Sequence, residues 1–316
     1  MSIILNNISK SYGKVKALED ISFEVKPGEL FGLIGPDGAG KTTLFRILTT
    51  LLIQDGGSAS VAGYDVLKQY KEIRNHVGYM PGRFSLYQDL TVEENLNFFA
   101  TIFGTTIVEN YDLIKDIYVQ IEPFKNRRAG KLSGGMKQKL ALCCALIHKP
   151  KVLFLDEPTT GVDPVSRKEF WEMLKRLQQK DITILVSTPY MDEAELCDRI
   201  ALITDGKILE INTPEAIKAS FPKKIYKVRT SQTYQLIIDL RSYPETYSAY
   251  PFGEYLHFTP KTASFLAEDL EKYLKLRQHK GIEVMETVAT IEDTFMDLSR
   301  ANELVGKLKG DNFLKT

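Results

Sequence analysis

Short hydrophobic runs alternate with stretches of helical periodicity from residue 3 to about residue 215. The runs are rich in Val, Ile and Leu without polar alternation, a pattern typical of strands that are covered on both faces of a parallel sheet. This alternation predicts an α/β domain. The predicted strands cover residues 22–25, 30–34, 152–155, 182–186 and 200–203, and the predicted helices cover 41–51, 92–101, 135–148, 164–179 and 190–198.

Two later segments depart from this alternation. Residues 82–132 have helical periodicity without clear strands, which predicts a helical subdomain inserted at about residues 82–135. After the break at residues 221–224, the pattern to residue 300 suggests three strands, a helix at 263–279, a strand and a helix, as in a small α+β domain. We therefore expect domains at residues 1–218 and 219–302, followed by a polar flexible tail at 303–316.

Composition narrows the class of protein. The 316 residues contain 41 Lys and Arg and 41 Asp and Glu, so the formal net charge is zero. The chain therefore lacks the excess of positive charge that would favour nucleic acid as a partner. Apolar runs are far shorter than the roughly 20 residues of a membrane span, and the first residues do not resemble a secretory signal. Three cysteines cannot all pair, which fits reduced thiols. We expect a cytoplasmic protein.

A glycine-rich segment lies between the strand ending at residue 34 and the helix starting at residue 41. Its glycines allow successive backbone N–H groups to surround a phosphate, and the helix directs its positive end toward it. In such a loop the lysine reaches the β- and γ-phosphates and the next hydroxyl binds Mg²⁺. The segment therefore predicts a nucleoside-triphosphate site. Its residues are Gly35, Pro36, Asp37, Gly38, Ala39, Gly40, Lys41, Thr42 and Thr43.

Two acidic residues, Asp156 and Glu157, follow the predicted strand at 152–155. Asp156 suits a contact with Mg²⁺, and Glu157 suits orienting or deprotonating an attacking water. Many strands end in acids, so a solvated strand end is the alternative for this pair alone. Together with the phosphate loop, the pair favours nucleoside-triphosphate binding.

Between the phosphate loop and this acidic strand, Ser133, Gly134 and Gly135 open an amphipathic helix. The order of these three motifs resembles the ATP-binding-cassette (ABC) superfamily over nearly all of residues 1–215. The resemblance implies a P-loop NTPase fold that binds ATP and Mg²⁺. It also implies a head-to-tail dimer, in which each ATP contacts the phosphate loop of one chain and Ser133 and Gly135 of the other.

Two further residues match ABC positions. The resemblance implies that Tyr12 stacks on adenine, although packing at a strand edge is the alternative for a single tyrosine. It implies that Asp163, in the Gly-Val-Asp-Pro segment 161–164, belongs to a loop that crosses the dimer interface.

Segments 37–43, 132–138, 190–195 and 289–295 resemble the exporter branch that includes daunorubicin-resistance ATPases. The resemblance implies separate transmembrane permease subunits, a place on the inner face of the cell membrane and an accessory or dimerisation role for residues 219–302. It implies that the helical subdomain docks the permease. Five aromatic and apolar side chains are candidates for lining the docking groove: Phe84, Leu86, Tyr87, Phe98 and Phe99. The alternative is that they fill the core of the subdomain, and this alternative is favoured for Phe98 and Phe99.

Two catalytic positions depart from the family pattern. Gly82 stands where the family has a glutamine near Mg²⁺ and the attacking water, and Pro189 stands at the position of the switch histidine. Proline offers neither a side-chain donor nor a backbone N–H to a phosphate. We therefore expect this chain to bind ATP but to hydrolyse it slowly, and to pair with a second, complete ABC ATPase. A homodimer, a non-hydrolysing regulatory subunit and a soluble ABC ATPase outside transport are the alternatives.

Overall fold

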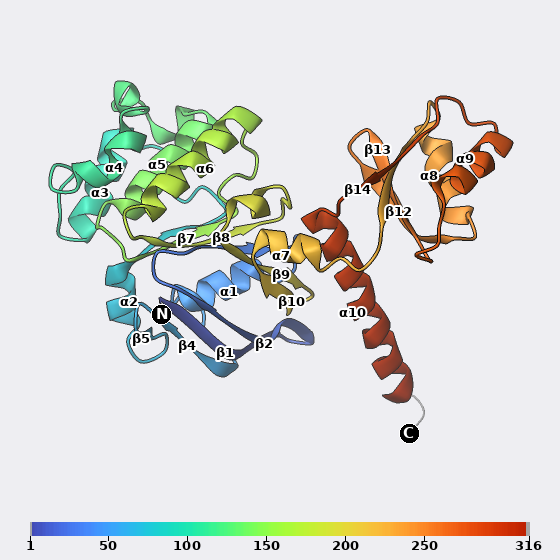
Figure 1. Cartoon of the computed structure of the whole chain (residues 1–316). Coiled ribbons are helices and arrows are strands. Elements are labelled where there is room, and N and C mark those ends of the chain that lie inside the picture. Colours follow the sequence, from blue (N-terminus) through green and yellow to red (C-terminus); the bar gives the residue numbers. More distant parts are fainter. Residues whose placement is uncertain (1, 314–316) are drawn as a thin grey trace. The chain divides into compact units, whose positions relative to one another are not determined.

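The computed structural model describes the backbone of residues 2–313 and the side chains of residues 2–302 (Figure 1). The chain forms two compact units, Met1–Pro214 and Glu215–Thr316. The sequence pattern places this division after residue 218. The division falls earlier because helix α7 (Pro214–Ala219) packs with the second unit, where Ile217 O accepts a hydrogen bond from Thr294 Oγ1 at 3.1 Å.

A six-stranded sheet organises the first unit. Its order is β10-β9-β3-β8-β7-β6, and all neighbouring pairs are parallel except β10 with β9. Every residue of β3, β7 and β8 is buried, which explains why these strands are mainly apolar and lack polar alternation. The predicted α/β fold is confirmed. The strands are β3 (Leu30–Ile34), β6 (Val77–Met80), β7 (Val152–Asp156), β8 (Thr183–Thr188), β9 (Arg199–Thr204) and β10 (Lys207–Asn212).

A second, antiparallel sheet of the first unit has the order β2-β1-β4-β5. The sequence pattern detects only its end at residues 22–25, because its strands alternate buried and exposed residues and contain register shifts. Its strands are β1 (Ile3–Tyr12), β2 (Val15–Val25), β4 (Gly56–Val61) and β5 (Tyr64–Asp65).

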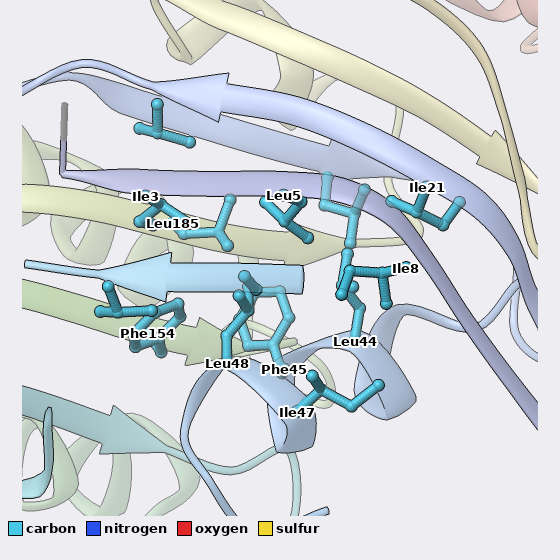
Figure 2. Packing of buried hydrophobic residues seen from close by; sticks show 14 of the residues in the cluster. Ile3, Leu5, Ile8, Ile21, Leu44, Phe45, Ile47, Leu48, Phe154 and Leu185 are labelled. Atoms are coloured by element: carbon cyan, nitrogen blue, oxygen red, sulfur yellow. The ribbon is translucent and has the colours of Figure 1, made fainter. Parts of the chain in front are cut away.

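Helix α1 (Lys41–Leu48) fills the space between the two sheets of the first unit. Figure 2 shows its side chains Leu44, Phe45 and Leu48 among Ile3 and Leu5 of β1 and residues of the six-stranded sheet. The helix ends at residue 48, earlier than the predicted 51, because Thr50 adopts a left-handed backbone conformation with φ of 63°. This packing fixes the start of α1 against the end of β3.

Replacing Phe45 by alanine tests this core. The ring is fully buried and meets Phe154 edge-on, with centroids 5.9 Å apart. We expect the free energy of unfolding to fall by about 3–5 kcal/mol. Urea unfolding followed by the fluorescence of Trp171, the only tryptophan, reports on this unit. The control Val108→Ala, at a side chain that is 85% exposed, should change this free energy by less than about 0.5 kcal/mol.

The remaining helices of the first unit are α2 (Tyr70–His76), α3 (Val92–Ile102), α4 (Tyr111–Tyr118), α5 (Gly134–Leu146) and α6 (Pro164–Gln178). The segment from residue 82 to α5 contains helices α3 and α4, which both contact α5. The predicted helix at 190–198 is wrong, since only a 3-10 turn forms at Glu193–Leu196. Pro189 precedes it, and Glu193 points inward to accept hydrogen bonds from Thr159 and Thr188.

The second unit is an antiparallel sheet of order β12-β13-β11-β14, and helices α8 and α9 share its hydrophobic core. The predicted order of three strands, a helix, a strand and a helix is observed, but the sequence pattern misses helix α8 between the first two strands. In this helix Leu236 and Leu240 lie one turn apart and are both buried. The elements are β11 (Ile225–Arg229), α8 (Thr233–Ser242), β12 (Thr246–Phe252), β13 (Tyr255–Pro260), α9 (Ala267–Leu276), β14 (Glu283–Thr287) and α10 (Ile291–Phe313).

The expected tail at 303–316 is helical as far as residue 313, because α10 continues into it. This part of the sequence contains several helix-forming Leu and Lys residues and no proline. Residues 314–316 lie outside the described residues.

Candidate functional site

The phosphate loop follows the fully buried strand β3 and leads directly into α1. Gly38 and Gly40 have φ of 82° and 102°, a region that other residues rarely adopt. A Cβ at Gly40 would also lie 2.4 Å from Ala17 O. No side chain caps the N-terminus of α1, so its first N–H groups face the loop. The loop therefore has the geometry that an anionic phosphate requires.

Lys41 links this loop to the acidic strand end. The side chain is only 2% exposed, and Nζ donates to Gly35 O at 2.7 Å and to Pro36 O at 2.9 Å. The same Nζ forms an ion pair with Glu157 Oε1 at 3.1 Å. The chain thus brings together a lysine and a carboxylate that are far apart in sequence.

Ser187 on β8 positions both acids. Its Oγ donates to Asp156 Oδ1 at 2.6 Å, and it accepts a hydrogen bond from the Glu157 N–H at 3.1 Å. Glu157 has φ of 51°, which costs about 1–2 kcal/mol for a residue with a Cβ. Burial, together with the negative charge of Asp156, raises the pKa of nearby Tyr79 to about 12. The acids therefore occupy a constrained and partly desolvated strand end.

A cavity of about 480 Å³ joins the phosphate loop to the acids. It brings together Thr42, Asp156 and Glu157, as their predicted roles require. The Thr42 hydroxyl and the Asp156 carboxylate are oxygen donors, which Mg²⁺ prefers, so these residues fit that ion together with phosphate oxygens. The full lining is Thr42, Arg46, Tyr79, Pro81, Gly82, Arg83, Asp156 and Glu157.

Gly82 and Pro189, the two positions that depart from the family pattern, lie near the residues of this site. A Cβ at Gly82 would lie 3.1 Å from Asp156 O and 3.8 Å from Glu157 Cβ, so the position is adjacent to both acids but carries no side chain. Pro189 directly follows β8, the strand that carries Ser187. None of the four histidines, all of them in the described part of the chain, lines the cavity.

The signature residues lie at the start of α5. Ser133 is its N-cap, and Ser133 Oγ accepts a hydrogen bond from Met136 N at 3.3 Å. A Cβ at Gly135 would lie 2.8 Å from Ser166 Oγ, so glycine allows α5 to approach α6 closely. Gly134 lies near Gly161 O, with a Cβ-to-oxygen distance of 3.6 Å. The signature and the 161–164 loop therefore lie side by side.

Asp163 caps α6 in the same way. Its Oδ1 accepts a hydrogen bond from Ser166 N at 3.0 Å, and this bond holds the pKa of Asp163 below its usual range. Ser133, Gly134 and Asp163 are all exposed. None of them lines the cavity at the phosphate loop. The predicted site residues thus form two groups on this chain.

Tyr12 lies at the end of β1, and 48% of the residue is exposed. Within the described residues, its ring contacts no other aromatic ring. About half of the residue is therefore accessible at the end of the strand.

A groove of about 470 Å³ separates the helical subdomain from the α/β core. Leu86 and Phe99 line it, whereas Phe84, Tyr87 and Phe98 do not. Phe98 is 37% exposed and stacks edge-on against Tyr87, with centroids 4.7 Å apart, so the expectation that it fills the subdomain core is wrong. The core is already filled by smaller side chains such as Leu96 and Ala100.

Sequence reasoning missed Arg46, Arg83 and Ser187. Signals for the two arginines exist, since Arg46 lies one helical turn after Thr42 and Arg83 directly follows Gly82. Nothing local identifies Ser187, because its role depends on the pairing of β8 with β7.

Comparison with known proteins decides the family. The family model for the ABC transporter matches residues 18–160. Nod factor export ATP-binding protein I of Burkholderia pseudomallei is 34% identical over 302 residues, covering 94% of this chain and 96% of that protein. The chain belongs to the ABC transporter family. It is an ATP-binding subunit of a transporter, and the ATPase prediction is confirmed at this level.

Other relatives agree. The probable multidrug ABC transporter ATP-binding protein YbhF of Escherichia coli K12 is 42% identical over 214 residues, which are 67% of this chain but only 37% of that protein. A solved ATP-binding subunit of an ABC transporter has a TM-score of 0.64 and 28% identity, covering 70% of this chain and 93% of that one. The dimeric cassette MJ0796 has a TM-score of 0.61 and 25% identity, covering 67% and 98%.

No helix among the described residues has both the length and the apolar character that a membrane span requires.

Proposed function

We propose that this chain is the ATP-binding subunit of an exporter, which binds Mg-ATP at a dimer interface and acts on separate permease subunits. The observation that carries the proposal is the cavity shared by Thr42, Asp156 and Glu157 beside the phosphate loop. The export direction is supported by the names of the relatives, which describe Nod factor export and multidrug transport.

A dimer is supported by the division of the site residues. The cavity holds the phosphate-loop group, while Ser133, Gly134 and Asp163 are exposed elsewhere on the chain. The free N–H groups at the start of α5 favour an anion such as a γ-phosphate. A second chain that places its signature over this cavity completes the nucleotide site. The solved cassette MJ0796 is described as dimeric.

A permease contact is supported by the groove between the helical subdomain and the α/β core. Its lining combines apolar side chains such as Leu86, Phe99 and Ile102 with His148, whose Nδ1 is buried without a hydrogen-bond partner. Such a groove suits a short amphipathic helix. We assign it to the cytoplasmic part of a permease, which holds the subunit at the inner face of the membrane.

Within this function, the chain's own site binds ATP but hydrolyses it slowly. Loss of one preorganised donor typically lowers a rate about a hundred- to a thousandfold, and losses within one catalytic unit do not simply multiply. Gly82 and Pro189 remove two such donors. We therefore favour a heterodimer with a complete second cassette over a homodimer. The same two positions support a second candidate, a non-hydrolysing regulatory subunit.

The purified chain tests the proposal. We expect it to bind Mg-ATP and to hydrolyse less than about one ATP per second, below the typical enzyme turnover of about ten per second. Light scattering with Mg-ATP should show whether it pairs with itself. Absence of nucleotide binding would contradict the whole proposal. Faster turnover would contradict only the slow site and would make a homodimeric motor the simpler function.

A further inference from the structure

Two arginine side chains line the nucleotide cavity without a carboxylate partner. Arg46 lies one turn after Thr42 on α1, and Arg83 follows Gly82 in the loop after β6. Both residues are exposed, and among the described residues neither guanidinium makes a hydrogen bond or an ion pair. Exposed arginines often face solvent, but these two border the same cavity from different elements.

The carboxylates of the cavity are already engaged by other groups. Asp156 accepts a hydrogen bond from Ser187, and Glu157 pairs with Lys41. Among the described residues, neither guanidinium therefore pairs directly with a carboxylate of the cavity. Because guanidinium binds phosphate oxygens in a bidentate manner, an anionic phosphate is the group that best fits two such neighbours.

The position of Arg83 indicates which phosphate is involved. Its neighbour Gly82 lies beside Asp156 and Glu157, at the acidic end of the cavity. The γ-phosphate must lie at this end if Glu157 is to act on a water that attacks it. A long arginine side chain beginning one residue from Gly82 reaches this region without blocking the acids.

We propose that Arg83, assisted by Arg46, binds the γ-phosphate of ATP and supplies the positive charge that the residues at positions 82 and 189 cannot supply. The inference rests on the proposed function, because it requires ATP in this cavity. It goes further by naming the residues that distinguish ATP from ADP. Only ATP carries the third phosphate, so loss of these charges weakens ATP binding selectively.

Equilibrium binding of ATP and of ADP with Mg²⁺ tests the inference, in chains that also carry Glu157→Gln to slow hydrolysis. Arg83→Ala should weaken ATP binding about tenfold and change ADP binding less than about twofold. Arg83→Lys should recover part of the loss, because lysine keeps the charge but not the bidentate geometry. Adding Arg46→Ala should weaken ATP binding further.

Arg127→Ala is the matched control. Arg127 is an exposed arginine of the helical subdomain that lies over the Phe124 ring and does not line the cavity. Its loss should change neither affinity. Thermal unfolding of each variant verifies the fold.

The outcomes separate this inference from the proposed function. If Arg83→Ala weakens ATP and ADP equally, or neither, the inference is wrong. If Lys41→Ala, in the same background, binds ATP as tightly as the chain with Lys41, the phosphate-loop site itself is wrong and both proposals fail. ATP binding that requires Lys41 but ignores Arg83 overturns only the role of Arg83.

Discussion

Glu157→Gln is expected to preserve Mg-ATP binding and to lower ATP turnover about a hundred- to ten-thousandfold, the range for loss of a general base. Glu157 lines the nucleotide cavity and has a side chain that is 23% exposed, so water reaches it. Glutamine keeps the size of the side chain but accepts no proton. Steady-state phosphate release and equilibrium ATP binding, measured on the same preparation, check both parts.

Glu157→Gln tests the carboxylate alone, because the free-energy cost of the backbone conformation at residue 157 is unchanged. The left-handed conformation at residue 157 is strained for any residue with a Cβ, and glutamine carries the same strain as glutamate. The matched control is Glu271→Gln, which removes a carboxylate that pairs with Lys275 in the second unit. That control should leave turnover unchanged. Unchanged turnover in Glu157→Gln would show that another group activates water.

A loss of ATP binding in Glu157→Gln would have a different meaning. If Glu157→Gln loses ATP binding as well as turnover, the ion pair between Lys41 and Glu157 has a structural role in shaping the loop. The lower turnover would then follow from the lost binding and would not by itself identify the carboxylate as the catalytic base.

The central strands of the first unit are predictable because their burial is complete. Residues 30–34 and 152–155 are buried throughout, so their sequences are apolar without alternation. Strands β1 and β4 are half-exposed and irregular, and their pattern is too weak to detect. The error at 190–198 has a tertiary cause, since the carboxylate of Glu193 turns inward to two threonine hydroxyls.

The site can be predicted from the sequence only where its residues are adjacent along the chain. The phosphate loop is one continuous segment, so the sequence identifies it together with the helix that follows. The ion pair between Lys41 and Glu157 depends on strand order, which places the ends of β3 and β7 near each other with β8 between them. The presence of Arg83 in the cavity likewise depends on β6 pairing with β7.

Restoring both missing donors should increase turnover. In a Gly82→Gln, Pro189→His double variant we expect ATP hydrolysis to rise about ten- to a hundredfold, less than the product of two full donor effects because such effects are not additive. Gly82 has no positive φ, so glutamine fits its backbone conformation. Its Cβ would lie 3.1 Å from Asp156 O, and the neighbouring chain must shift by a few tenths of an ångström.

The control is a Gly82→Ala, Pro189→Ala double variant, which makes the same backbone changes without adding donors. If turnover in the Gln and His variant exceeds that of the alanine variant, the side chains themselves act on the reaction. Equal turnover would mean that Gly82 and Pro189 do not limit hydrolysis. The slow site would then have another origin, such as a signature that only a different partner chain supplies. A rise in turnover without a second cassette would instead show that two copies of this chain form a complete site.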